Sequence, residues 1–436
     1  MSDQKNSWGI IGGGIMGMTL ALRLSQKGYK VTVFESSPKP GGLAGSVDMN
    51  GVTWDRFYHV ILMSDLETRK ILGEIGLEDE LNWVETKTGF FSGGRLYSMS
   101  NIFEYLKFPP INIFGKFRLG LTIIAASLIR DRKRMEKIAV EKWLIRWSGK
   151  NVFDKIWLPL LKAKLGDHYK DTSASFIWST IQRMYAARRT GLKKEMFGYV
   201  SGGYERINRS FEEKLKSLGV EILVNKHVSL VEQGINDRIT VKTESSDTYD
   251  FDHVISTLHS GDSVKIAPSL NAEEAERHRS IKYLGVVCPL VLLRKPVSNY
   301  YVTNITDTWP PFTGIIEMTA LVDPKELNDL NLVYLPKYVE PDHEIFGKSK
   351  TEIREYFLKP FFKMYPALSE DDIVHFSIAL EKRVFALPVL HYSEILPPVS
   401  TSLQRYYIIN SAQIVNSTLN VNETIRIAEE KLAEIL

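Results

Sequence analysis

The first sixty residues alternate between short apolar runs and turns rich in glycine. Residues 8–11 predict a short apolar strand, and the apolar run that follows the first glycine turn predicts a helix terminated by Gly28. Apolar residues then alternate over 30–34, which predicts a second strand ending at Glu35. Strand, glycine turn, helix and strand in this order are typical of a βαβ unit. The pattern therefore predicts an α/β fold with parallel strands.

Two later segments continue the pattern. A helix with one apolar face is predicted over about 204–218, followed by strands over 220–224 and 252–257. A strand is predicted over 406–409, and apolar residues at every third or fourth position predict a helix from about residue 421. These segments supply further strands and helices for the same type of sheet.

Composition narrows the class of protein. The 436 residues include 55 Lys and Arg, 52 Asp and Glu, and one cysteine. This balance argues against a nucleic-acid partner. One cysteine makes no intrachain disulfide, and no Cys/His pair has metal-ligand spacing, so we predict no metal site and a cytoplasmic location. No uncharged apolar stretch approaches the roughly 18 residues of a membrane-spanning helix.

The first glycine turn has the spacing G-x-G-x-x-G. Gly12 permits a tight turn, Gly14 lets the backbone approach a pyrophosphate, and Gly17 allows close packing of helix on strand. The helix N-terminus offers free N–H groups to phosphates. Glu35 can accept hydrogen bonds from ribose hydroxyls and would repel a 2′-phosphate. The turn therefore predicts a dinucleotide site that does not select NADP.

A second glycine-rich turn, with Gly41 and Gly42, follows the acid. With it the chain resembles the flavin-containing amine oxidase superfamily, which includes protoporphyrinogen oxidases and carotenoid desaturases. The resemblance implies FAD as the cofactor, with this turn beside the diphosphate. Leu43 stands where many members have arginine. No second G-x-G-x-x-G follows a strand, so no separate NAD(P)H domain is predicted.

The predicted helices and strands of residues 204–257, and those from residue 406 onwards, follow the order of elements found in the superfamily. By resemblance Val228 takes the position of a valine that contacts adenine; the alternative is an ordinary buried strand valine. The resemblance also implies that the N-terminus of the last helix, with Asn420 and Asn422, points at the flavin pyrimidine ring. Such a helix dipole stabilises the negative charge of reduced flavin. Simple capping by the asparagine side chains is the alternative.

The resemblance also implies the domain organisation. We predict a discontinuous Rossmann-type FAD-binding domain built from residues 1–60, 196–264 and 396–436. An α+β substrate-binding domain, residues 61–195 and 265–395, is inserted into it, and its first part is mainly helical and basic.

Three residues of the substrate side are candidates for catalysis. His59 lies in a stretch, 57–63, that looks alignable with a motif of UDP-galactopyranose mutases, and Met63 departs from that motif. We predict His59 near the flavin as a hydrogen-bonding or proton-shuttling group. Glu317 is either a buried acid or an exposed strand residue. Arg383 either binds an anionic substrate group or forms a surface ion pair.

The near-neutral total conceals an uneven charge distribution. Residues 101–209 carry a net charge of +13 and the rest of the chain −10. Within 101–150 an apolar run is flanked by basic residues, which suits peripheral contact with a membrane surface. The same charge suits a phosphate-bearing substrate or a merely solvated helical face. Three arginines are candidate phosphate clamps: Arg183, Arg188 and Arg189.

These features predict an FAD-dependent oxidoreductase, cytoplasmic or peripheral to the membrane. It would transfer a hydride from a C–H bond of a small organic substrate, lipid-like or sugar-linked, to flavin N5. The first alternative is a non-redox flavoenzyme like UDP-galactopyranose mutase, acting on a nucleotide- or lipid-linked sugar. The second is a flavin-binding assembly or carrier protein without turnover.

Overall fold

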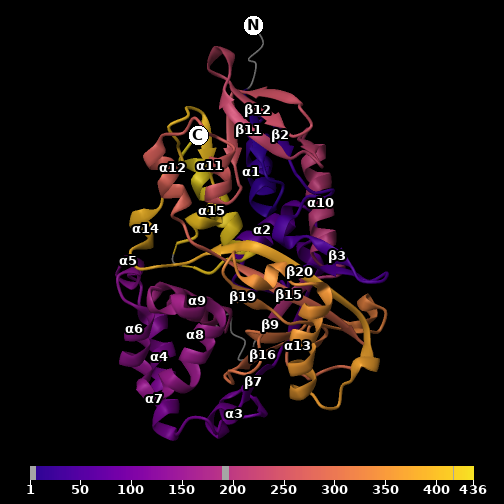
Figure 1. The fold of residues 1–436 in the computed structure, drawn as a ribbon, viewed down its shortest axis with the longest axis vertical. Helices are drawn as coiled ribbons and strands as arrows, with labels where there is room; N and C mark the ends of the chain where they lie inside the picture. The colour runs from indigo at the N-terminus through magenta and orange to yellow at the C-terminus, as the bar shows by residue number, and fades with distance from the viewer. Residues whose placement is uncertain (1–5, 189–195, 416) are drawn as a thin grey trace.

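The computed structural model describes residues 6–188, 196–415 and 417–436 (Figure 1). A parallel sheet with its helices lies at one end of the molecule, and a larger sheet and a group of helices lie side by side towards the other end. The main-chain path crosses between these parts several times, so residues far apart in the sequence meet at their junctions.

The parallel sheet has five strands in the order β10-β2-β1-β14-β21. Their bounds are β10 Glu221–Leu223, β2 Lys30–Phe34, β1 Ser7–Ile11, β14 His253–Ser256 and β21 Tyr406–Ile408. Every neighbouring pair is parallel. The predicted α/β fold with a parallel sheet is confirmed. The strands come from the three predicted parts of the FAD-binding domain, whereas the domain boundaries stay a prediction.

Four helices cover the apolar residues of this sheet. They are α1 Ile15–Gln26, α2 Leu66–Glu74, α10 Gly203–Ser217 and α15 Val421–Ala433. Their apolar faces share one core with Trp8 and Ile10 of β1. Arg23 of α1 ties three helices together, because its guanidinium donates to Glu74 of α2 and Glu429 of α15. The first and last helices of the chain therefore pack as one layer.

The larger sheet has eight strands, one of which is long and fully buried. They are β7 Thr88–Ser92, β8 Arg95–Ser98, β15 Tyr283–Leu293, β16 Val302–Ile305, β17 Gly314–Glu317, β18 Asn331–Tyr334, β19 Lys337–Val339 and β20 Ile373–Ala386. All residues of β15 are buried. Val286 and Cys288 face one apolar core, while Val287 and Val291 face another that helix α13, Lys350–Met364, helps to form. A strand covered on both faces needs apolar side chains throughout.

The helical group forms a separate core. Its longer helices are α4 Ile113–Leu128, α6 Val140–Ser148, α8 Leu158–Leu165 and α9 Ser175–Arg188, with the short α3 Ile102–Lys107 and α5 Arg132–Glu136 beside them. Trp143, Phe153 and Trp178 are buried in this core, which also includes Phe385 from β20. Among the described residues, no helix is long and apolar enough to cross a bilayer.

Candidate functional site

The two glycine turns lie against each other at the carboxyl edge of the parallel sheet. A Cβ atom on Gly17 would lie 1.9 Å from the carbonyl oxygen of Gly12, and Gly12 itself has a φ of +105°. Gly14 pairs with Gly41, and a Cβ atom on Gly42 would lie 3.1 Å from the Cα of Gly14. The two turns, with Gly12, Gly14, Gly41 and Gly42, therefore form a cradle of bare backbone, which we call the glycine cradle. The binding of a diphosphate requires such a surface.

Glu35 connects the cradle to the end of β2. Its buried carboxylate accepts hydrogen bonds from the backbone N–H groups of Gly13 and Ser37, both at 2.8 Å. The Oε1 atom also accepts from the Ser36 hydroxyl at 3.4 Å, whereas Oε2 accepts only from Gly13 among the described residues and so retains acceptor capacity. The contact with ribose stays a prediction, and this acceptor fits the ribose hydroxyls.

Val228 and Asn422 are the two other residues predicted to contact the cofactor, and each has a clear place in the structure. Val228 begins β11, Val228–Gln233, and is buried in one apolar cluster with Phe34. Its predicted contact with adenine is not tested. The side-chain oxygen of Asn422 accepts from the N–H groups of Glu67 and Thr68 at the start of α2. The structure thus uses the Asn422 side chain as a helix cap, so its predicted role is limited to the backbone at the N-terminus of α15.

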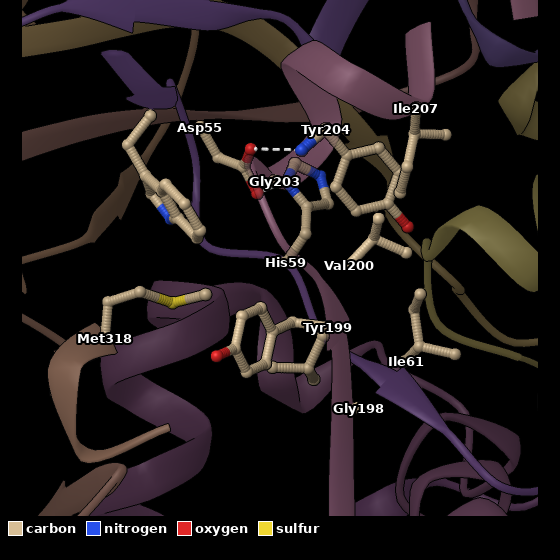
Figure 2. Close-up of a pocket in the computed structure, with 12 residues that line it drawn as sticks. Asp55, His59, Ile61, Gly198, Tyr199, Val200, Gly203, Tyr204, Ile207 and Met318 are labelled. Carbon is tan, nitrogen blue, oxygen red and sulfur yellow. Dashed lines mark hydrogen bonds and ion pairs between the residues drawn. The ribbon is translucent and has the colours of Figure 1, made fainter. Parts of the chain in front are cut away.

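His59 lies in a pocket near the end of β4, Thr53–Asp55 (Figure 2). Its ring packs beside that of Tyr204, with centroids 4.8 Å apart, and its Nδ1 lies 3.8 Å from Oδ2 of Asp55. The backbone N–H of Tyr204 donates to Oδ1 of Asp55 at 2.8 Å. A Cβ atom on Gly203 would lie 2.8 Å from the same oxygen, so glycine is needed there. Other residues that line the pocket are Trp54, Val60, Ile61, Gly198, Tyr199, Val200, Ile207 and Met318.

Burial sets the protonation of this pocket. It raises the pKa of Asp55 to about 8 and lowers the pKa of His59 to about 4. Between these values both groups are neutral. Nδ1 of His59 and the hydroxyl of Tyr204 are buried without a hydrogen-bond partner among the described residues. Such atoms favour a ligand that carries polar groups. Sequence reasoning missed Asp55 and Tyr204 as site residues, although Asp55 lies four positions before His59 and Tyr204 begins a predicted helix.

The sequence model of the family described as flavin containing amine oxidoreductase matches residues 15–400. The chain belongs to this family. The predicted resemblance is thereby confirmed, and the cofactor is FAD. The glycine cradle and Glu35 are the residues that would hold its diphosphate and ribose.

Two curated relatives and one solved structure are similar to this chain. The 1-hydroxycarotenoid 3,4-desaturase of Flavobacterium sp. (strain P99-3) is 24% identical over 57% of this chain and 56% of its own length. Protoporphyrinogen oxidase 2 of Arabidopsis thaliana is 32% identical over 35% of this chain and 31% of its own. The chain spans about half the length of the curated relatives it matches. Reduced UDP-galactopyranose mutase has the same fold, with a TM-score of 0.75 at 15% identity over 99% and 94% of the two chains.

Glu317 is buried at the end of β17, as one of its two predicted settings required. Its carboxylate accepts from the N–H groups of Val297 and Ser298, both at 2.7 Å, and from the Ser298 hydroxyl at 2.8 Å. Burial raises its pKa despite these bonds. The neighbouring Met318 lines the pocket of His59, whereas the Glu317 side chain holds a turn. The geometry therefore gives Glu317 a structural task and does not bring it to His59.

Arg383 forms the surface ion pair that was the alternative to anion binding. Its Nη1 lies 2.7 and 2.6 Å from the two carboxylate oxygens of Asp262, and 44% of its side chain is exposed. It lines a surface hollow together with Lys265 and Arg279, separate from the residues around His59.

Of the three candidate phosphate clamps, the structure describes the side chain of Arg183. Arg183 of α9 makes a two-point contact with Asp65, at 3.2 and 2.7 Å. Its charge is therefore engaged within the protein. The side chain of Arg188 and the whole of Arg189 lie outside the described residues.

Proposed function

We propose that this protein is an FAD-dependent oxidoreductase that takes a hydride from a C–H bond of a lipid-like organic substrate. The observation that carries the proposal is the bare glycine cradle with Glu35 at the carboxyl edge of the parallel sheet, in a chain of this family. Bound FAD supplies the hydride acceptor, flavin N5. Because one relative is a 1-hydroxycarotenoid desaturase, extended apolar molecules are the first substrates to test.

The residues of this chain have separate tasks in the proposal. The cradle and the N-terminus of α1 bind the diphosphate, and Glu35 holds the ribose. The imidazole of His59 is neutral near neutral pH, and its Nδ1 has no hydrogen-bond partner among the described residues. This nitrogen can accept a hydrogen bond or, as a weak general base, a proton during the reaction. Asp55, protonated below about pH 8, lies close enough to orient that ring.

The test combines cofactor content with anaerobic reduction. We expect the purified protein to carry stoichiometric FAD. Its flavin absorbance should bleach when a 1-hydroxycarotenoid or protoporphyrinogen is added without oxygen. A protein without bound flavin would refute the proposal, and bound flavin that no substrate reduces would favour an assembly or carrier role.

The non-redox alternative has one supporting observation and one against it. The shared fold with UDP-galactopyranose mutase supports it, whereas the engagement of Arg183 by Asp65 removes one predicted diphosphate contact. Chemically reduced protein incubated with UDP-galactopyranose separates the two functions. Conversion of that sugar nucleotide without net oxidation would replace the oxidoreductase proposal.

We also propose that α3 and α4 contact an anionic membrane. Their exposed side chains are strongly apolar: Phe103, Leu106, Ile113, Phe114, Phe117, Ile124 and Leu128. Phe114 is 77% and Phe117 68% exposed. Arg132, Lys133 and Arg134 follow directly on the exposed side of α5. Exposed aromatic residues beside basic ones are typical of helices that lie in a membrane interface.

Vesicle binding tests this surface. The wild-type protein should bind vesicles that contain phosphatidylglycerol, and less as salt rises. Replacing Phe114 and Phe117 with serine, or reversing the three α5 charges, should weaken binding by about tenfold or more. Ile235→Ser and Lys359→Glu are matched exposed controls that should change little. Equal binding by all variants would refute the membrane proposal.

A further inference from the structure

A lysine reaches across the junction between the helical group and the large sheet. Lys164, near the end of α8, is half-buried, and its Nζ lies 3.2 Å from the ring centroid of Tyr338 in β19. The ring of Phe385 in β20 is 5.0 Å away from the same atom. The two rings meet edge to face, with centroids 5.8 Å apart. The ammonium group therefore sits against an aromatic corner.

No carboxylate of the described residues forms an ion pair with Lys164. Other basic residues of the helical group have an oxygen partner: Lys116 donates to the carbonyl of Leu106 at 2.6 Å, and Lys155 to that of Pro110 at 3.1 Å. A partly desolvated cation without a counter-ion is costly, and aromatic faces offset only part of that cost. An anionic ligand would complete the site.

The aromatic corner contacts the residue that precedes His59 in the chain. The hydroxyl of Tyr338 lies 2.9 Å from that of Tyr58, the residue directly before His59. The ring of Tyr58 in turn packs against that of Tyr334, with centroids 6.0 Å apart. Aromatic side chains therefore lead from Lys164 towards the candidate site.

We propose that Lys164 binds the anionic group of the substrate, a carboxylate or a phosphate. Tyr338, Phe385 and Tyr58 would contact the apolar part that extends towards His59. The inference rests on the proposed function, because it assumes that the substrate reacts beside His59. The proposed substrate has an apolar or aromatic body with a single anionic end.

The protonation of Lys164 gives this site a pH dependence. Burial lowers the pKa of Lys164 to about 7, and an arriving anion favours the protonated form. The groups that face it are the Tyr338 hydroxyl, whose pKa burial raises to about 12, and the uncharged Phe385. The next segment along the chain carries His168, which is paired with Glu340 at 3.0 Å. Anion binding should therefore weaken as the pH rises above about 7.

Ligand binding to the oxidised FAD holoenzyme tests the inference without turnover. Calorimetry would compare 2-naphthoate and 2-naphthyl phosphate with the uncharged 2-naphthamide and with inorganic phosphate alone. Lys164→Met should weaken naphthoate or naphthyl phosphate binding by about tenfold or more and leave naphthamide unchanged, and Lys164→Arg should retain most of the affinity. Lys162→Met, an exposed lysine of the same helix, is the matched control.

Each outcome has a definite meaning. Naphthoate affinity that is equal in the wild type and Lys164→Met, or lost equally in Lys162→Met, would overturn the inference. So would the absence of binding to the wild type. Inorganic phosphate that binds as well as the naphthyl ligands, in a Lys164-dependent way, would identify a site for free phosphate and overturn the substrate assignment. Because no electron transfer is measured, failure here leaves the redox proposal standing.

Discussion

The nucleotide end and the substrate side of this molecule are built on different principles. At the nucleotide end the site is backbone: glycines bring two turns into contact, and Glu35 ties them together through N–H groups. On the substrate side the pocket is made of side chains from segments that are distant in the sequence, such as His59, Tyr204 and Met318. The first kind of site tolerates almost no added atom. The second depends on the protonation and orientation of a few groups.

This difference predicts how each region responds to substitution. A backbone site fails completely when a Cβ atom intrudes, because the chain cannot move aside locally. In a site made of side chains, one substitution removes the role of that residue alone, and the fold persists. The following substitutions test that contrast, in order of decreasing expected effect.

Gly17→Val should abolish FAD binding. Its side chain would begin 1.9 Å from the carbonyl oxygen of Gly12, so α1 must shift away from the cradle. The ratio of flavin to protein absorbance measures the loss. Gly120→Ala is the control, since Gly120 also lies within a helix but has no neighbour within 4 Å of the added atom. Flavin retained in Gly17→Val would contradict the prediction that a backbone site fails when a Cβ atom intrudes.

His59→Gln should keep FAD but slow anaerobic flavin reduction by about 10²–10⁴-fold, the usual contribution of a general acid or base. Stopped-flow bleaching with the reducing substrate provides the measurement. His227→Gln serves as the control, because that histidine is exposed and lies outside the pocket. An unchanged rate would remove His59 from the site.

Asp55→Asn should become more stable relative to the wild type as the pH rises. Burial raises the pKa of Asp55 from 3.8 to about 8, so its ionisation opposes folding between these values. The wild type therefore loses stability towards pH 8, by at most about 1.4 kcal/mol per pH unit, and the amide does not. Urea unfolding at pH 5 and pH 8 checks the sign. The opposite trend would mean that Asp55 is charged in the folded protein.

Glu317→Gln should lower the free energy of unfolding by about 1–3 kcal/mol, because the amide cannot accept from all three donors of the turn. The flavin reduction rate should stay the same. Glu355→Gln, on the exposed face of α13, is the control for urea unfolding. A slowed reduction in a stable Glu317 variant would return this residue to the catalytic set.

Arg383→Met should have the smallest effect, below about 1 kcal/mol on unfolding, since its partner is a half-exposed aspartate. Flavin reduction should not change. A marked fall in the reduction rate would show that the surface hollow around Arg383 belongs to the substrate side.

The same contrast explains what the sequence could predict. Gly17 could be identified because its constraint comes from the backbone of Gly12, a few positions away, and the parallel sheet followed from short-range periodicity. Asp55 was missed because its donor, Tyr204, lies 149 residues further along the chain. Arg183 was considered as a phosphate clamp because nothing near it in sequence reveals Asp65. Long-range pairs decide which charges are already engaged, and a single sequence does not contain them.

The cap that Asn422 places on α2 has a consequence for biosynthesis. The last helix and strand β21 complete a layer whose other members, α1 and β1, are made first. During translation, domains form largely as their segments emerge. Until residues beyond 406 leave the ribosome, β14 has an unpaired edge and α2 lacks its cap. A chain stalled before residue 406 therefore presents an incomplete parallel sheet, with an unpaired edge on β14, to the quality-control machinery.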